Sequence, residues 1–225
     1  SLEFSPRLGH EIRQLEFELD TSVVTDTDDD VETVEVELTP VGIEFESGDE
    51  LRLEIERTHE SLDEGFEIFE GIDVPADDYD FTRVRLEFDS AEKRRFGVEA
   101  FVTGGEFFDG DRQTYSAGLS WRPNALFRGG LEYTHNDVSL EAGDFETQVG
   151  RLRADFSFSQ ELSWNSFVQW DNVSNTFGVN SRWRWIPRPG QELFFVFNQT
   201  LMNEDDSLAP LYQELAVKLV YTLRY

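Results

Sequence analysis

The strongest constraint on the fold of this chain is a period of two in its apolar residues, clearest near the C-terminal end. Leu, Val or Tyr occupies every second position from 215 to 225, and the positions between them are mixed. Successive side chains of an extended strand point to opposite faces, so this segment has one wholly apolar face. The same period recurs over residues 152–158, 162–170 and 177–185. The pattern predicts β-strands rather than helices.

The same template predicts twelve strands along the chain, an even number. Most are longer than the roughly five or six residues typical of soluble sheets, and they match the roughly nine to eleven that a tilted strand needs to cross a bilayer. Pro40 cannot donate a ladder hydrogen bond, so we expect a bulge in the second strand. The strands are predicted at residues 9–20, 33–46, 50–60, 78–90, 94–107, 112–121, 126–136, 147–159, 162–172, 176–186, 191–202 and 213–225.

The connections between these strands are predicted to alternate in length. Short turns on one rim and longer loops on the other are typical of outer-membrane barrels, whose short side is periplasmic. An even strand number then places both termini on the periplasmic side. The short turns are expected near residues 46–49, 89–92, 122–124, 159–161 and 187–190, and longer acidic loops at 21–32, 61–77, 137–146 and 203–212, with 108–111 and 173–175 as short exceptions.

Composition excludes several classes of protein. The chain has 19 Lys and Arg against 47 Asp and Glu, a formal net charge of −28, which opposes binding to nucleic acid. It contains no cysteine, so disulfides and thiolate zinc sites are excluded. No apolar run approaches the roughly eighteen residues of a membrane helix. The sequence begins at Ser1 without Met or a signal-like stretch, so we expect a mature form or a fragment of a longer protein.

A soluble β-sandwich or lipocalin-like binder is the competing fold. It would bury Trp183 and Trp185 in a small interior and leave Arg182 and Arg184 crowded on the outside. The pattern therefore favours an all-β, antiparallel transmembrane β-barrel, with residues 1–225 forming a single barrel domain or the C-terminal portion of a larger one.

Charged residues on the inward face of the predicted strands differ between the two halves of the chain. An acidic wall and a basic wall in a water-filled lumen would filter ions, because charged rings at close quarters set selectivity. In a narrow barrel the two walls would instead pair as a salt-bridged plug. The predicted acidic wall is Glu16, Glu18, Glu35, Glu37, Glu44, Glu54 and Glu56, and the predicted basic wall is Arg151, Arg153, Arg182, Arg184, Lys218 and Arg224.

Aromatic residues recur on the outward face, together with Leu and Val. Flat rings can stack on sugars, but girdles of Trp and Tyr at the two headgroup levels of a membrane explain them more simply. The predicted interface residues are Trp164, Trp170, Trp183, Trp185, Tyr221 and Tyr225.

Evidence for catalysis or metal binding is weak. The acidic runs at residues 26–30 and 203–206 offer oxygen ligands for calcium but lack the spacing of an EF-hand, so solvated acidic loops explain them more simply. His59 and His135, the latter close to Asp137, fall near the long-loop rim without a nucleophile elbow. We therefore predict no catalytic residues, no metal site and no cofactor.

Several stretches from about Phe66 onward carry a family resemblance. They are similar to the C-terminal barrel region of a bacterial outer-membrane family that joins a carbohydrate-binding-like domain of the family-9 type to a large uncharacterised barrel domain. The resemblance implies a barrel fold and an outer-membrane location, and it supplies no catalytic residues. The stretches are residues 66–68, 72–75, 79–81, 105–110, 121–123, 133–138 and 151–197, especially Gln169, Asn180, Arg182, Arg184, Trp185 and the turn at 188–190.

The sequence thus predicts a porin-like passive channel in the bacterial outer membrane. The alternative is a non-conducting structural or docking barrel within a larger outer-membrane assembly. The expected partners are the lipid bilayer, lipopolysaccharide, the outer-membrane assembly machinery and other outer-membrane subunits, and not nucleic acid.

Overall fold

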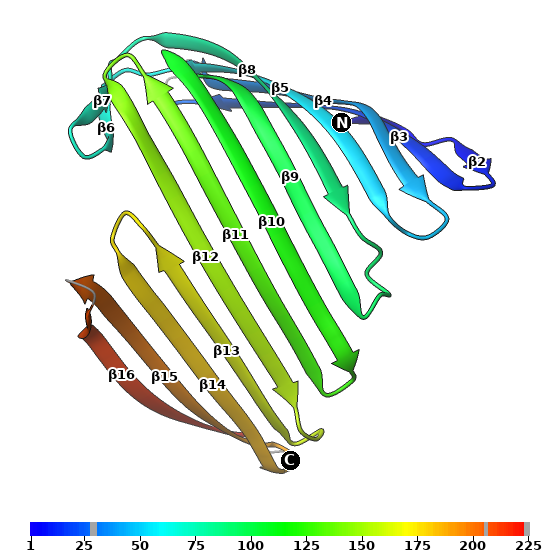
Figure 1. Cartoon of the computed structure of the whole chain (residues 1–225), viewed down its shortest axis with the longest axis vertical. Helices are drawn as coiled ribbons and strands as arrows, with labels where there is room; N and C mark the ends of the chain where they lie inside the picture. Colours follow the sequence, from blue (N-terminus) through cyan, green and yellow to red (C-terminus); the bar gives the residue numbers. More distant parts are fainter. Residues whose placement is uncertain (28–30, 205–206, 223–225) are drawn as a thin grey trace. The chain divides into compact units, whose positions relative to one another are not determined.

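The computed structural model describes residues 1–27, 31–204 and 207–222 of the chain. Within these ranges every regular element is a β-strand, and the strand pairs are antiparallel (Figure 1). No helix among the described residues is long and apolar enough to cross a membrane. The prediction of an all-β antiparallel fold is confirmed.

Twelve long strands and four short ones make up the described part of the chain. Each strand predicted from the sequence coincides with one of the long strands. The long strands are β3 (Ile12–Thr25), β4 (Val31–Phe45), β5 (Glu50–Ser61), β8 (Asp78–Asp89), β9 (Phe96–Phe107), β10 (Gly110–Asn124), β11 (Phe127–Leu140), β12 (Gly143–Ser157), β13 (Leu162–Asp171), β14 (Thr176–Arg188), β15 (Gln191–Glu204) and β16 (Ser207–Tyr221). The short strands are β1 (Leu2–Phe4), β2 (Arg7–Gly9), β6 (Phe66–Phe69) and β7 (Ile72–Val74).

Hydrogen bonds connect the long strands mainly in sequence order. The order is β1-β3-β4-β5-β8-β9-β10-β11-β12-β13-β14-β15-β16, β2 pairs with β3, and β6 pairs only with β7. The tight turn between β14 and β15 uses Gly190, whose φ of 86° suits glycine and whose carbonyl accepts a hydrogen bond from Thr222 N at 2.7 Å. The bulge expected at Pro40 is confirmed, because the register between β4 and β5 shifts between Leu38 and Val41.

The short turns form close to their predicted positions, but strands extend into three of the four segments predicted as long loops. β11 continues to Leu140 and β12 begins at Gly143, so a tight hairpin replaces the loop expected at 137–146. β3 likewise continues to Thr25 and β15 to Glu204. The connection from β5 to β8 remains long and contains the β6–β7 hairpin. The extended end of β11 keeps the apolar period, because Val138 and Leu140 are buried while Asp137 and Ser139 are exposed.

The chain divides into two compact units. The first contains Ser1–Glu92, Val98–Ala117 and His135–Glu146. The second contains Lys93–Gly97, Gly118–Thr134 and Thr147–Tyr225.

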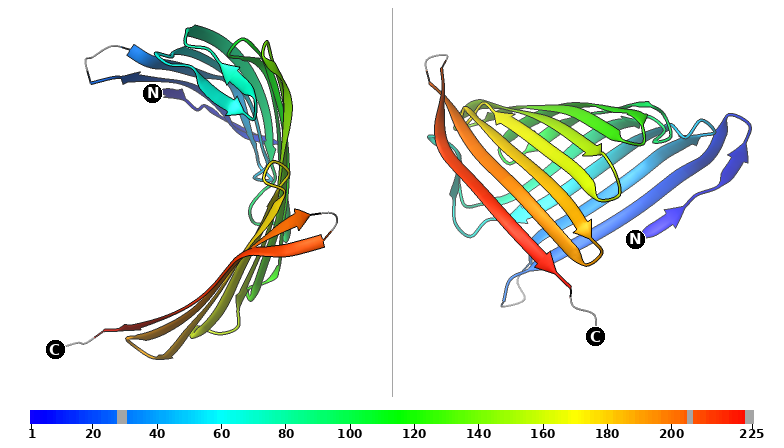
Figure 2. Two further views of the ribbon diagram at one scale, coloured as in Figure 1. Left: turned by 90° about the vertical axis from the view of Figure 1, so that its left-hand side faces the viewer. Right: turned by 90° about the horizontal axis from the view of Figure 1, so that it is seen from below.

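The first unit has a hydrophobic cluster around the β6–β7 hairpin, which lies against one face of the neighbouring strands (cyan in Figure 2, left). Val74 is fully buried there, and the Phe69 ring stacks on Phe145 with centroids 4.6 Å apart. Partly buried residues such as Leu62, Phe107 and Phe108 pack around the cluster. Its buried members are Ile72, Val74, Tyr79, Phe81, Val138 and Leu140.

Candidate functional site

Strand β8 shows how side chains are distributed in the first unit. Arg83 and Arg85 point to one face, where only 16% of the Arg83 side chain is exposed. Val84, Leu86 and Phe88 point to the opposite face, where 45% of Leu86 is exposed. A soluble sheet shelters its apolar face and exposes its charges, so this strand has the reverse arrangement.

The strand register brings the predicted acidic residues onto the face that carries Arg83. Glu37 pairs with Glu56, and Glu56 pairs with Arg83 on the next strand. Farther along the same strands, Glu16 pairs with Gly42 and Gly42 with Arg52. Strand alternation and the register shift between Leu38 and Val41 place all seven predicted acidic residues on this face, which we call the polar face of the first unit: Glu16, Glu18, Glu35, Glu37, Glu44, Glu54 and Glu56.

Arginines that the sequence analysis did not single out share this polar face. Arg83 pairs with Glu56, and Arg85 Nε lies 3.6 Å from Glu54 Oε2. The Arg85 guanidinium also lies 3.7 Å from the centre of the Phe101 ring. The signal that could have identified Arg83 and Arg85 is their alternation with apolar residues along β8. The four arginines are Arg52, Arg83, Arg85 and Arg112.

A pocket of about 320 Å³ opens on the polar face. It draws side chains from β4, β5, β8, β9, β10 and β11, all from the first unit. Tyr79 and Phe81 precede Arg83 on the same face and belong to the hairpin cluster, so this cluster lies at one end of the pocket. The charged residues that line the pocket are Glu37, Glu54, Glu56, Arg83, Arg85 and Arg112.

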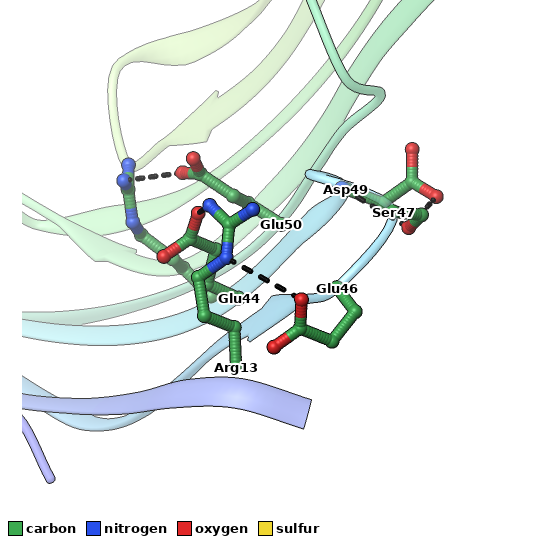
Figure 3. A network of polar contacts seen from close by, with 7 residues as sticks. Arg13, Glu44, Glu46, Ser47, Asp49 and Glu50 are labelled. Atoms are coloured by element: carbon green, nitrogen blue, oxygen red, sulfur yellow. Dashed lines mark hydrogen bonds and ion pairs between the residues drawn. The ribbon is translucent and has the colours of Figure 1, made fainter. Parts of the chain in front are cut away.

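A smaller polar network lies near the turn between β4 and β5 (Figure 3). Arg13 pairs with Glu44, and its Nε lies 3.9 Å from Glu46 Oε2. Arg52 Nη2 lies 2.7 Å from Glu50 Oε2 beside a pocket of about 170 Å³. The charges of carboxylates and guanidiniums therefore compensate each other along this face, which is not a purely acidic wall.

In the second unit, the register also gathers the predicted basic residues on one face. Arg184 and Lys218 both pair with Phe194 of β15. Arg182 pairs with Asn165 of β13, and Arg153 of β12 pairs with Phe167 on the same face of β13. Two of these residues have carboxylate partners: Arg184 with Glu192 at 2.7 Å and Arg151 with Glu132 at 2.8 Å. The face carries Arg151, Arg153, Arg182, Arg184 and Lys218, whereas Arg224 lies outside the described residues.

A row of aromatic rings crosses the opposite, apolar face of the second unit. Neighbouring ring centroids in the row are 4.5–6.0 Å apart. The indole Nε1 of Trp164 donates a hydrogen bond to Ser181 Oγ at 2.7 Å, so its polar atom is satisfied. This aromatic row consists of Phe96, Trp121, Phe127, Phe156, Trp164 and Trp183.

The other predicted interface residues lie beyond this row. Trp185 and Tyr221 are exposed on the same apolar face. The Trp170 ring lies 6.4 Å from that of Phe177, toward the other end of β13. Tyr225 lies outside the described residues.

The two histidines considered for catalysis have ordinary surroundings. His59 Nδ1 lies 3.5 Å from Asp80 Oδ1, and the His135 ring stacks on Tyr115 with centroids 6.4 Å apart. Within the described part of the chain, no group of three or more His, Asp or Glu side chains is arranged to hold a metal ion. The acidic runs considered for calcium include residues 28–30 and 205–206, which lie outside the described ranges.

Comparisons with known proteins return similar solved structures at low sequence identity. No protein-family model matches the chain, and a search of curated proteins finds no significant match. The outer membrane channel DcaP of Acinetobacter baumannii is 8% identical, with a TM-score of 0.47 over 97% of this chain and 83% of that one. The NanC porin is 11% identical, with a TM-score of 0.34 over 92% of this chain and 100% of that one.

Proposed function

We propose that this chain forms a β-barrel of the bacterial outer membrane and acts as a passive, porin-like pore. The observation that carries the proposal is the reversed distribution of side chains along β8, with sheltered arginines and exposed Val84, Leu86 and Phe88. An exposed apolar face is stable against lipid, and a charged face is stable against a water-filled lumen. The proposal assigns no catalytic residue to the pore.

The aromatic residues support a membrane position for the apolar face. Trp164 and Trp170 lie six residues apart on β13, and Trp183 and Phe177 lie six residues apart on β14. At about 3.3 Å per residue, each pair spans about 20 Å along its strand. Aromatic residues at two levels with Val and Ser between them fit the two interfaces of a bilayer.

The polar faces support an aqueous lumen of mixed charge. The first unit combines glutamates with arginines, and the second unit carries Arg151, Arg153, Arg182 and Arg184. Such side chains would bring both cations and anions close to fixed charges. A lipid and lipopolysaccharide environment, insertion by the assembly machinery and termini on the periplasmic side all follow from the same proposal.

Planar-bilayer conductance tests the pore directly. The purified chain is reconstituted into a lipid bilayer in KCl, and current is recorded at fixed voltage. The proposal predicts resolvable conductance steps. A chain that inserts with a β-sheet circular dichroism spectrum but gives no steps would contradict it.

A second candidate function, a non-conducting docking barrel, is favoured by the β6–β7 hairpin. Its hydrophobic cluster includes Tyr79 and Phe81 on the polar face, beside the pocket. A hairpin packed against this face would narrow a lumen at that end. Replacing residues 66–74 with a short Gly-Ser linker distinguishes the two functions: a pore conducts with or without the hairpin, whereas an occluded barrel conducts only in the shortened variant.

A further inference from the structure

The pocket of the first unit is lined by equal numbers of carboxylates and guanidiniums, but one of each has no ion-pair partner. Its lining contains three carboxylates and three guanidiniums, so its formal charge is zero. Arg83 pairs with Glu56, and Arg85 lies 3.6 Å from Glu54. Among the described residues, Glu37 and Arg112 take part in no ion pair. One carboxylate and one guanidinium therefore line the pocket without a direct ion-pair partner.

We propose that this pocket binds a short zwitterionic solute of dipeptide size, with its carboxylate on Arg112 and its ammonium group on Glu37. The proposal rests on the proposed pore function, because it names the class of solute that such a pore would hold. A ligand with both charges supplies the two missing partners at once, whereas an ion of either sign leaves one of the two groups unmatched.

Arg112 has the surroundings expected of a carboxylate-binding residue. Its guanidinium lies 4.4 Å from the centre of the Phe107 ring, and its Nε is buried without a hydrogen-bond partner among the described residues. Stacking on a ring fixes the plane of a guanidinium but leaves its N–H donors unused. A carboxylate can accept two parallel hydrogen bonds from such a group, which is the geometry that arginine recognises best.

Glu37 lies on the opposite side of the pocket. β4 carries Glu37, β10 carries Arg112, and three strands of the sheet lie between them. Four strand spacings of about 4.8 Å put the two backbones about 19 Å apart along a flat sheet, and both side chains line the pocket between them. An extended dipeptide spans about 7 Å, so its two charged ends can approach both groups together.

The middle of the pocket suits the neutral part of such a solute. Thr114 Oγ1 donates a hydrogen bond to Asn136 Oδ1 at 2.8 Å, and Thr103 and Phe101 also line the pocket. A volume of about 320 Å³ lies at the small end of the range for ligand sites, which is roughly 300–1,000 Å³. A dipeptide backbone fits this mixture of hydroxyl, amide and aromatic surface.

Equilibrium dialysis of the full chain in detergent micelles tests the proposal. The probes are glycylglycine, its N-acetyl form with only the negative charge, and its C-terminal amide with only the positive charge. Wild type is expected to bind glycylglycine at least about tenfold more tightly than either analogue, because each charge-assisted hydrogen bond is worth about that factor. Equal binding of all three probes would overturn the proposal.

Two variants assign the ends of the ligand. Arg112→Met should lower glycylglycine affinity to that of the amide probe, and Glu37→Gln should lower it to that of the N-acetyl probe. The matched controls are Arg57→Met, on the opposite face, and Glu99→Gln, which does not line the pocket. Controls that weaken binding as much as the pocket variants would show a general charge effect and contradict the assignment.

This measurement is independent of conduction. A chain that binds glycylglycine selectively but shows no conductance steps would contradict the pore and leave the binding site standing. Conductance steps without selective binding would support the pore and contradict the binding site. Glu37→Gln is nearly isosteric and leaves the Arg83–Glu56 and Arg85–Glu54 pairs of the pocket intact, so its result also holds if Arg112→Met fails to give the β-sheet circular dichroism spectrum.

Discussion

At the scale of single residues, the face on which a side chain lies decides its surroundings more than its chemical type does. On β8, charged residues are sheltered while Leu86 is 45% exposed. On β15, the aromatic residue Phe194 lies on the polar face and is buried. The Arg182 guanidinium lies 4.6 Å from the centre of its ring. A membrane barrel accounts for both, because lipid accepts exposed leucine, whereas a hydrated lumen accepts arginine.

Adjacent residues of β14 allow a matched test of this face assignment. Val179 lies on the apolar face between the levels of Phe177 and Trp183, and Asn180 lies on the polar face. Val179→Arg should lower the free energy of unfolding in lipid by about 2–4 kcal/mol, since it places charge near the middle of the hydrocarbon. Asn180→Arg should cost far less. Urea unfolding in vesicles measures both, and equal losses would contradict the assignment.

The shared face of the seven glutamates could be predicted from the sequence, because strand alternation combined with the bulge expected at Pro40 brings Glu44 to the face of Glu35 and Glu37. Their pairing could not. Glu56 meets Arg83 and Glu54 meets Arg85 only because β5 and β8 are neighbours across a long connection, with a register that the sequence pattern does not specify. The excess of Asp and Glu over Lys and Arg in the sequence does not indicate which arginines lie among the glutamates.

At the scale of elements, the β6–β7 hairpin packs into a buried hydrophobic cluster like the core of a soluble protein. Val74 and Ile72 are buried against Val138 and Leu140, whereas Asp73 between them is exposed. The hairpin is thus held by apolar contacts at one end of the pocket, and its attachment can be weakened without touching the long strands.

Val74→Asp should detach the hairpin, because a carboxylate buried without a partner costs several kcal/mol. Limited proteolysis should then cut within residues 62–77 faster than in wild type, with the β-sheet circular dichroism spectrum retained. Asp73→Ala, on the exposed side of the same strand, is the control and should leave the cleavage rate unchanged. Faster cleavage in both variants would mean that the hairpin is not held by its buried face.

The twelve long strands could be predicted because the apolar period runs through most of each one. Their ends could not, because β11 and β12 continue to residues 140 and 143 through Asp, Glu and Gly, which resemble loop composition. At the end of β11, Val138 and Leu140 are buried in the hydrophobic cluster and alternate with the exposed Asp137 and Ser139, so the apolar period continues within a segment of loop-like composition. Composition therefore does not mark the end of a strand.

At the scale of the whole molecule, both units repeat one arrangement: an exposed apolar face and a polar face. Only 39% of the residues are hydrophobic, yet this suffices for a membrane barrel, because lipid meets every second side chain of a strand. The same arrangement makes a net charge of −28 compatible with the proposed membrane location, since the seven glutamates of the first unit share the polar face.

A spin-label scan of β8 tests this arrangement most directly, and the absence of cysteine from the chain makes single-site labelling straightforward. Cysteine is introduced singly at positions 84 to 88, and each label is measured in lipid vesicles for collision with oxygen and with a water-soluble nickel complex. The account predicts that oxygen collisions are highest at 84, 86 and 88, and nickel collisions at 85 and 87. Labels at 84, 86 and 88 that are shielded from oxygen, or show no alternation with 85 and 87, would contradict it.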